Sequence, residues 1–212
     1  MAKNNVSLMD RRKFVRTGAI GTLAFQVAGG TALLSPREAR AKNVELHHLD
    51  NSQAKLLGAI CEHLLPGAIE AGVVEFIDHQ LGEIPNECLL MGKFFPGINA
   101  PYTDFYHGGL RALETYTQKV FSKSFEDLAS EEKDQTVQAL WAGNADPWQG
   151  PPPPVFYMAV RSDAVDVVYG TESGFEELGL PYLAHISPPS HGPDQWVAPK
   201  NGQPANNNAG AE

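Results

Sequence analysis

The chain has 212 residues, of which 42% are hydrophobic and 19% are charged, so it is long enough for a domain with a hydrophobic core. Acidic residues outnumber basic ones, 25 to 16, and this excess of negative charge argues against nucleic-acid binding. The two cysteines have neither C-x-x-C nor C-x-x-C-H spacing, which excludes cysteine-rich iron–sulfur ligation and covalent haem attachment within the chain.

Residues 1–41 have the organisation of a bacterial twin-arginine export signal. Two adjacent arginines and a nearby aromatic residue are followed by an uncharged stretch from 17 to 34 and by a small-x-small cleavage pattern. The residues that carry these features are Arg11, Arg12 and Phe14, and then Ala39 and Ala41. A membrane anchor is the alternative, but several glycines and threonines make the stretch weakly hydrophobic. We therefore expect a cleaved signal that exports a folded protein.

Removal of this signal would make the chain more acidic. The signal contains seven basic and two acidic residues, so the remainder keeps nine basic and 23 acidic ones, a net charge of −14. No second long apolar run follows, so no membrane span is predicted there. Cys61 and Cys88 are the only cysteines, and an oxidising periplasm would allow a disulfide between them, worth about 3–4 kcal/mol. Two buried, unpaired thiols are the alternative.

Periodic apolar residues predict a series of helices after residue 50. Asn51 or Ser52 is the expected N-cap of the first helix, and Pro66-Gly67 ends it. Further helices are expected over about 73–81, 104–120, 131–141 and 155–169. No stretch alternates convincingly as a strand does. The predicted fold is therefore all-α, a small helical bundle with a long, irregular, Pro-rich C-terminal arm.

Proline-rich and polar stretches define the remaining organisation. Residues 146–154 are predicted to be a rigid, polyproline-like connector, and the chain beyond Gly179 is irregular. The end of the chain is polar and is expected to be disordered. The predicted domains are the signal peptide over 1–41, a helical domain over 42–190 and a polar tail over 191–212.

Motifs for self-sufficient catalysis are not found. The chain has seven histidines but no His-Glu-x-x-His motif, and the histidines are scattered over separate predicted elements. A Gly-x-Gly-x-x-Gly fingerprint after a strand, a phosphate loop and a Gly-x-Ser-x-Gly elbow are also missing from the sequence. No catalytic, cofactor-binding or metal-ligating residue is therefore assigned to this chain.

Aromatic and charged residues are densest between 156 and 189. Arg161, Asp163 and Asp166 interrupt an otherwise apolar helix, which indicates an internal charge pair, a cap for the following loop, or an exposed binding surface. Because Tyr, Trp and Arg are frequent anchors of protein interfaces, we favour a partner interface. The candidate interface residues are Tyr157, Arg161, Asp163, Tyr169, Tyr182, His185 and Trp196.

This region resembles the C-terminal signature of the gluconate 2-dehydrogenase subunit 3 family, the small subunits of bacterial flavin-dependent sugar and polyol dehydrogenases. The resemblance extends weakly back to about Asn51. Its residues are Phe156-Tyr157, the run from Arg161 to Thr171, Gly174-Phe175, Leu178-Gly179, Pro181-Tyr182, His185 and Pro188-Pro189.

The resemblance implies an accessory subunit that is not itself catalytic and holds no cofactor. A separate large subunit of the glucose–methanol–choline type would carry FAD, and a c-type cytochrome subunit with haem c would take the electrons. The small subunit would support folding of the catalytic subunit and its co-export by the twin-arginine translocase. The complex would lie in the periplasm, with membrane contact only through the complex. A free-standing periplasmic binding or structural protein is the alternative.

Overall fold

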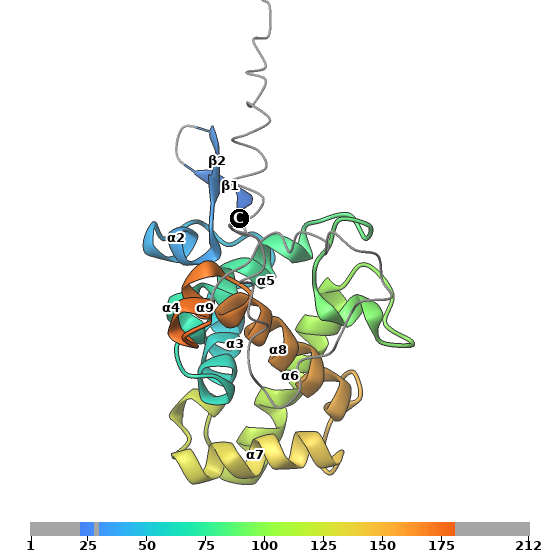
Figure 1. Ribbon diagram of the computed structural model, residues 1–212. Helices are drawn as coiled ribbons and strands as arrows, with labels where there is room; N and C mark the ends of the chain where they lie inside the picture. Colours follow the sequence, from blue (N-terminus) through green and yellow to red (C-terminus); the bar gives the residue numbers. More distant parts are fainter. Residues whose placement is uncertain (1–21, 28–29, 181–212) are drawn as a thin grey trace, which may run out of the picture. The chain divides into compact units, whose positions relative to one another are not determined.

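The computed structural model describes residues 22–27 and 30–180, in which helices predominate and the only sheet has two strands (Figure 1). These residues belong to one unit of the chain, which extends to Tyr182. None of the described helices is both long and apolar enough to cross a bilayer. The predicted polar tail lies outside the described residues. In chain order the elements are β1 (Leu23–Val27), β2 (Gly30–Leu34), α2 (Pro36–Ala41), α3 (Asn51–Leu64), α4 (Ala68–Ala71), α5 (Val73–Leu81), η1 (Met91–Phe94), α6 (Thr103–Phe121), η2 (Phe125–Asp127), α7 (Ser130–Ala142), α8 (Pro153–Tyr169) and α9 (Glu172–Glu177).

Capping side chains fix where the helices begin. The carboxylate of Asp50 accepts hydrogen bonds from the backbone N–H groups of Ser52 and Gln53, and the Gln53 side chain accepts one from the Asp50 N–H. This capping box starts α3 one residue earlier than the predicted N-cap. In α7 the Glu132 carboxylate reaches back 2.8 Å to the N–H of Ala129.

The end of the proline run belongs to a helix rather than to the connector. α8 begins at Pro153 with Pro152 as its N-cap, two residues before the predicted start. Proline fits the first turn of a helix because that turn leaves its N–H groups unbonded and needs the φ that proline already has. The helix nevertheless ends at Tyr169, as the periodicity predicts.

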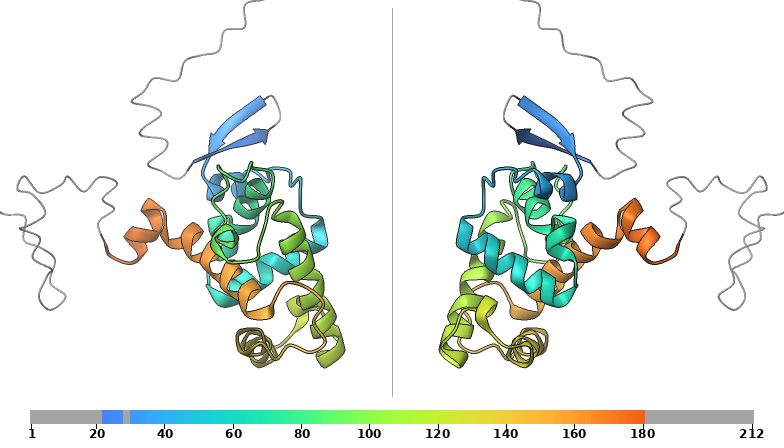
Figure 2. Two further views of the ribbon diagram at one scale, coloured as in Figure 1. Left: turned by 90° about the vertical axis from the view of Figure 1, so that its right-hand side faces the viewer. Right: turned by 90° about the vertical axis from the view of Figure 1, so that its left-hand side faces the viewer.

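The hairpin β1–β2 corrects the sequence-based expectation that no strand is present. Its antiparallel register pairs Leu23 with Leu34 and Val27 with Gly30. Along β1 the side chain of Phe25 is buried while its two neighbours are exposed, which is the alternation of a strand. Both views in Figure 2 show the hairpin projecting from one end of the helical part.

The core of the helical part is organised around α8, which packs against α3, α4, α5, α6 and α7. Its apolar stripe includes the fully buried Phe156 and Val160. Leu57 of α3, Ile77 of α5 and Leu113 of α6 are buried in the same core. A separate small cluster joins the hairpin to α2 through Phe25, Leu34 and Ala39. The prediction of a mainly helical fold, made from the periodicity of apolar residues, is thus confirmed.

Candidate functional site

The polar centre of α8 is Asp163, whose side chain is fully buried. Its Oδ1 accepts a hydrogen bond of 2.8 Å from the backbone N–H of Met91, and its Oδ2 accepts one from the hydroxyl of Tyr106 on α6. Both donors come from distant parts of the chain, 72 and 57 residues away. The carboxylate therefore ties α6 and the segment around η1 to α8.

Burial controls the protonation of the groups around Asp163. It raises the pKa of Asp163 to about 7, against the opposite effect of the two hydrogen bonds. Burial also raises the pKa of the Tyr106 hydroxyl and of the thiols of Cys61 and Cys88. Because the thiolate is the reactive form of cysteine, these thiols are held in their inert form. Both cysteines are free in the structure, and the disulfide between them stays a prediction.

The loop between α5 and α6 is fixed from inside by two side chains. The Gln80 Oε1 atom accepts a hydrogen bond of 2.7 Å from the N–H of Leu89, and Asp163 holds Met91 two residues further on. Gln80, like Asp163, is buried. A buried amide and a buried carboxylate thus determine how this loop is presented.

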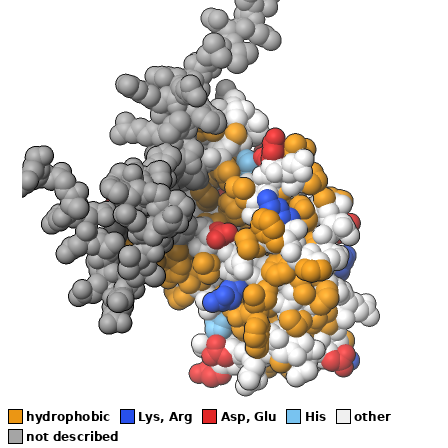
Figure 3. All heavy atoms as spheres, turned by 45° about the vertical axis from the view of Figure 1, so that its right-hand side comes forward, with side chains coloured by type: hydrophobic (Ala, Val, Ile, Leu, Met, Phe, Trp, Pro, Cys, Tyr) orange, Lys and Arg blue, Asp and Glu red, His pale blue; other side chains and the backbone are white. Residues whose placement is uncertain are grey.

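The loop carries three large apolar side chains on its outer side. Ile84, Leu89 and Phe94 are 58%, 52% and 66% exposed, and we call them the apolar loop surface. Lys93 lies beside Phe94, with its Nζ 4.9 Å from the centre of the Phe94 ring. Figure 3 brings the side of the molecule with this loop forward and shows hydrophobic side chains exposed over much of that face. Larger exposed apolar patches are typical of protein-binding surfaces, and this loop is therefore a candidate for one.

Two of the predicted interface residues lie on the accessible side of α8. Tyr157 is half-buried, and its ring packs edge-to-face against the exposed Trp141 of α7, with 5.6 Å between centroids. Arg161 follows one turn later and is exposed. Within residues 22–27 and 30–180, no ion pair joins Arg161 to Asp163 or Asp166. The geometry therefore does not support the internal charge pair considered as an alternative.

The other predicted site residues have different placements. Asp163 is buried in the core, where a partner cannot reach it, and its carboxyl is bonded to Met91 and Tyr106. Tyr169 is half-buried at the end of α8. In α2, Ala39 is buried and Ala41 is exposed. The remaining candidates lie outside the described residues: Arg11, Arg12, Phe14, Tyr182, His185 and Trp196.

Asp78 is a structural residue that sequence reasoning missed. Its carboxylate accepts three backbone hydrogen bonds of 2.8 Å, from His47, His48 and Leu49. These bonds hold the segment before α3 against α5. A separation of about 30 residues leaves no local motif, and the only signal is an acidic residue on the apolar stripe of a helix.

The side chains of three histidines in the described part have structural partners. His63 Nε2 lies 2.9 Å from Asp134 of α7, and His107 Nε2 lies 2.8 Å from the carbonyl oxygen of His48. The ring of His79 packs against Phe25 of the hairpin. Among the residues that the structure describes, no group of three or more His, Cys, Asp or Glu side chains is placed to hold a metal ion.

The fold and surface define a small, mainly helical protein with a rigidly held, exposed apolar loop. The family described as gluconate 2-dehydrogenase subunit 3 matches residues 51–185 of the 212. Because the match covers more than half of the chain, the protein belongs to this family, which confirms the resemblance noted in the sequence. Membership implies an accessory subunit of a dehydrogenase complex. Comparisons with curated proteins and with solved structures gave no match.

Proposed function

We propose that this chain is the non-catalytic accessory subunit of a periplasmic, FAD-dependent gluconate or sugar dehydrogenase complex. In this proposal it supports the folding of a catalytic subunit of the glucose–methanol–choline type and its co-export by the twin-arginine translocase. The observation that carries the proposal is the family match, which begins at the first residue of α3 and runs past α9. It therefore includes every helix of the α8-centred core.

The apolar loop surface supports a stable contact with the catalytic subunit. Its three side chains are exposed, and buried hydrogen bonds to Gln80 and Asp163 fix the backbone beneath them. A surface that is already ordered loses little conformational entropy when a partner covers it. Tyr157, Trp141 and Arg161 add aromatic and cationic groups of the kind that anchor interfaces.

The redox chemistry is proposed to belong to the partners. FAD would be in the catalytic subunit, and haem c in a cytochrome subunit that passes electrons on at the inner membrane. This chain would contribute binding and export. The buried phenol of Tyr106 and the buried carboxyl of Asp163 support this division, because they are engaged in holding α6, α8 and the loop together.

The twin-arginine pair gives the first test. With the catalytic subunit co-expressed, Arg11→Lys/Arg12→Lys should leave both chains in the cytoplasm, because the partner would depend on this signal. Flavin absorbance and dehydrogenase activity in the periplasm should fall together, and a tagged wild-type chain should bring down a yellow flavoprotein. Lys3→Gln, which removes a charge outside the pair, is the control. Normal export of the flavoprotein in the double variant would refute the escort role.

A further inference from the structure

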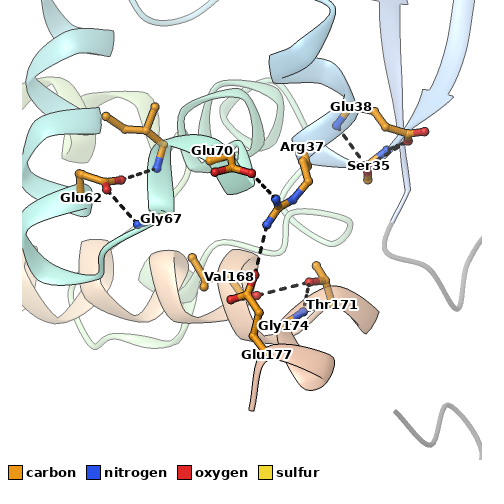
Figure 4. Close-up of polar contacts among 11 residues, drawn as sticks. Ser35, Arg37, Glu38, Glu62, Gly67, Glu70, Val168, Thr171, Gly174 and Glu177 are labelled. Atoms are coloured by element: carbon orange, nitrogen blue, oxygen red, sulfur yellow. Dashed lines mark hydrogen bonds and ion pairs between the residues drawn. The ribbon is translucent and has the colours of Figure 1, made fainter. Parts of the chain in front are cut away.

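The short helix α2 is docked on the family-matched domain, although it lies outside the matched residues. Ser35 and Glu38 form a capping box that starts the helix. α2 packs against α4 and α5. Arg37 Nη1 is 2.7 Å from Glu70 Oε1 on α4, and its Nη2 is 3.9 Å from Glu177 on α9. Figure 4 shows the Arg37 side chain pointing between Glu70 of α4 and Glu177 of α9.

A second arginine of α2 reaches a buried carboxylate. Arg40 Nη1 lies 3.5 Å from Glu75 Oε1 on α5, and Glu75 is only 5% exposed. The other oxygen of this carboxylate is buried without a hydrogen-bond partner in the described structure. Burial raises the pKa of Glu75, and Arg40 opposes that effect. The guanidinium is therefore the charge that compensates this buried group while α2 is docked.

The surface that receives α2 is formed by residues inside the family match. Gly72 has φ +86°, and a Cβ atom there would lie 2.1 Å from the carbonyl oxygen of Pro36. A side chain at this position would therefore prevent the start of α2 from lying against the junction of α4 and α5. The Glu62 carboxylate accepts bonds of 2.9 Å from the N–H groups of Gly67 and Ile69 and so fixes the beginning of α4 (Figure 4).

The predicted cleavage bond, between Ala41 and Lys42, lies in the last turn of this docked helix. The Lys42 N–H donates to the carbonyl oxygen of Glu38 at 3.0 Å, and the Val44 N–H donates to that of Ala39 at 3.1 Å. Ala39 has no exposed surface because it packs in the small cluster with the hairpin. A peptidase needs an accessible, locally unfolded segment, and this segment is helical and partly buried.

We propose that α4 and α5 form an intramolecular binding site for the end of the export signal, with Glu70 and Glu75 as its arginine-binding residues. Docking holds the bond after Ala41 in a folded, helical segment, so hydrolysis of that bond by signal peptidase requires α2 to leave the site and unwind. This inference rests on the proposed export function. When opening is fast relative to cleavage, the rate of signal removal follows the small population of undocked chains.

The test changes the receiving surface and leaves the peptidase's own substrate sequence intact. Glu70→Gln/Glu75→Gln removes both carboxylate partners. Glu70→Gln alone changes a mostly exposed side chain and so leaves the core untouched. Glu131→Gln, an exposed residue of α7, is the control. Trypsin cleavage of the purified full chain after Arg37 and Arg40 measures docking and does not depend on export. Pulse-labelling of cells measures the rate of signal removal.

We expect the rates of trypsin cleavage and of signal removal to rise in the double variant. The rise should be roughly threefold if the Arg37–Glu70 and Arg40–Glu75 pairs contribute as partly exposed ion pairs do. Glu70→Gln should give a smaller rise, and Glu131→Gln none. Unchanged trypsin and signal-removal rates in the double variant would overturn the docking proposal. Export that is independent of Arg11 and Arg12 would instead contradict the proposed function, and the trypsin measurement would still decide whether α2 docks.

Discussion

At the scale of single residues, Asp163 makes the stability of the protein depend on pH. Its carboxyl has a pKa of about 7 in the folded protein, against an ordinary value of 3.8. The folded state therefore binds this proton more tightly than the unfolded chain does. Its contribution to stability is fully present below the pKa of the unfolded state and is lost as pH rises through the pKa of the folded state. The loss is on the order of 4 kcal/mol.

The substitution Asp163→Asn should remove this dependence, because asparagine has the shape of the protonated carboxyl and stays neutral. The free energy of unfolding of the variant minus that of the wild type should increase between about pH 5 and about pH 8, measured by urea denaturation. Taking the difference cancels the titration of carboxylates such as Glu38, whose pKa is lowered mainly by its backbone hydrogen bond with Ser35. Asp104→Asn, an exposed position, is the control. A difference that does not vary with pH would show that the pKa of Asp163 in the folded protein is close to its ordinary value.

The same residue shows how far a sequence can identify a site. A carboxylate within the apolar stripe of α8 is conspicuous in the sequence, but its role depends on Met91 and Tyr106, which only the tertiary fold brings to it. Asp78 was missed for the same reason, since its three partners belong to another segment. Tyr157 and Arg161 were chosen by residue type, and the structure shows the first half-buried and the second exposed, so their role in an interface stays a prediction.

At the scale of elements, α6 and α8 approach each other closely at one glycine. A Cβ atom on Gly109 would lie 2.2 Å from Cδ2 of Phe156, whose ring is fully buried. This aromatic ring therefore occupies the space where α6 has no side chain. The contact sets how closely α6 and α8 approach each other.

Gly109→Ala should destabilise the fold by about 1–3 kcal/mol, because the added methyl group must displace a packed ring. Thermal or urea unfolding measures this change. Gly58→Ala, also in a helix interior, is the matched control, since its Cβ would meet neighbours at 3.4 Å or more. Helix propensity should make that change neutral or stabilising. Adding Phe156→Leu should partly restore the Gly109→Ala protein, and strictly additive losses would contradict the packing argument.

The elements differ in how well local sequence determines them. α5 begins and ends within one residue of the prediction, because glycines flank a short apolar stripe. The hairpin was missed because its alternation spans five residues within a stretch that also has the composition of a signal. The start of α8 was misplaced because a proline run is equally compatible with an extended connector and a first helical turn.

At the scale of the whole described unit, internal polar groups and external apolar groups act together. Asp163 and Gln80 hold the loop from inside, and its outer side exposes Ile84, Leu89 and Phe94. A monomer gains no stability from exposing these side chains. We therefore propose that a partner covers them, and under the proposed function this partner is the catalytic subunit.

Leu89→Ser/Phe94→Ser should therefore weaken binding to the catalytic subunit while leaving the unfolding of the isolated chain nearly unchanged. Loss of two interface anchors should cost about 1–3 kcal/mol, which is about a 5- to 150-fold increase in Kd by surface plasmon resonance or titration calorimetry. Val120→Ser, which removes an exposed apolar side chain near the far end of α6, is the matched control. If the double variant bound as tightly as the wild type, the interface would have to lie elsewhere, and the α8 surface of Tyr157 and Arg161 would be the next to test.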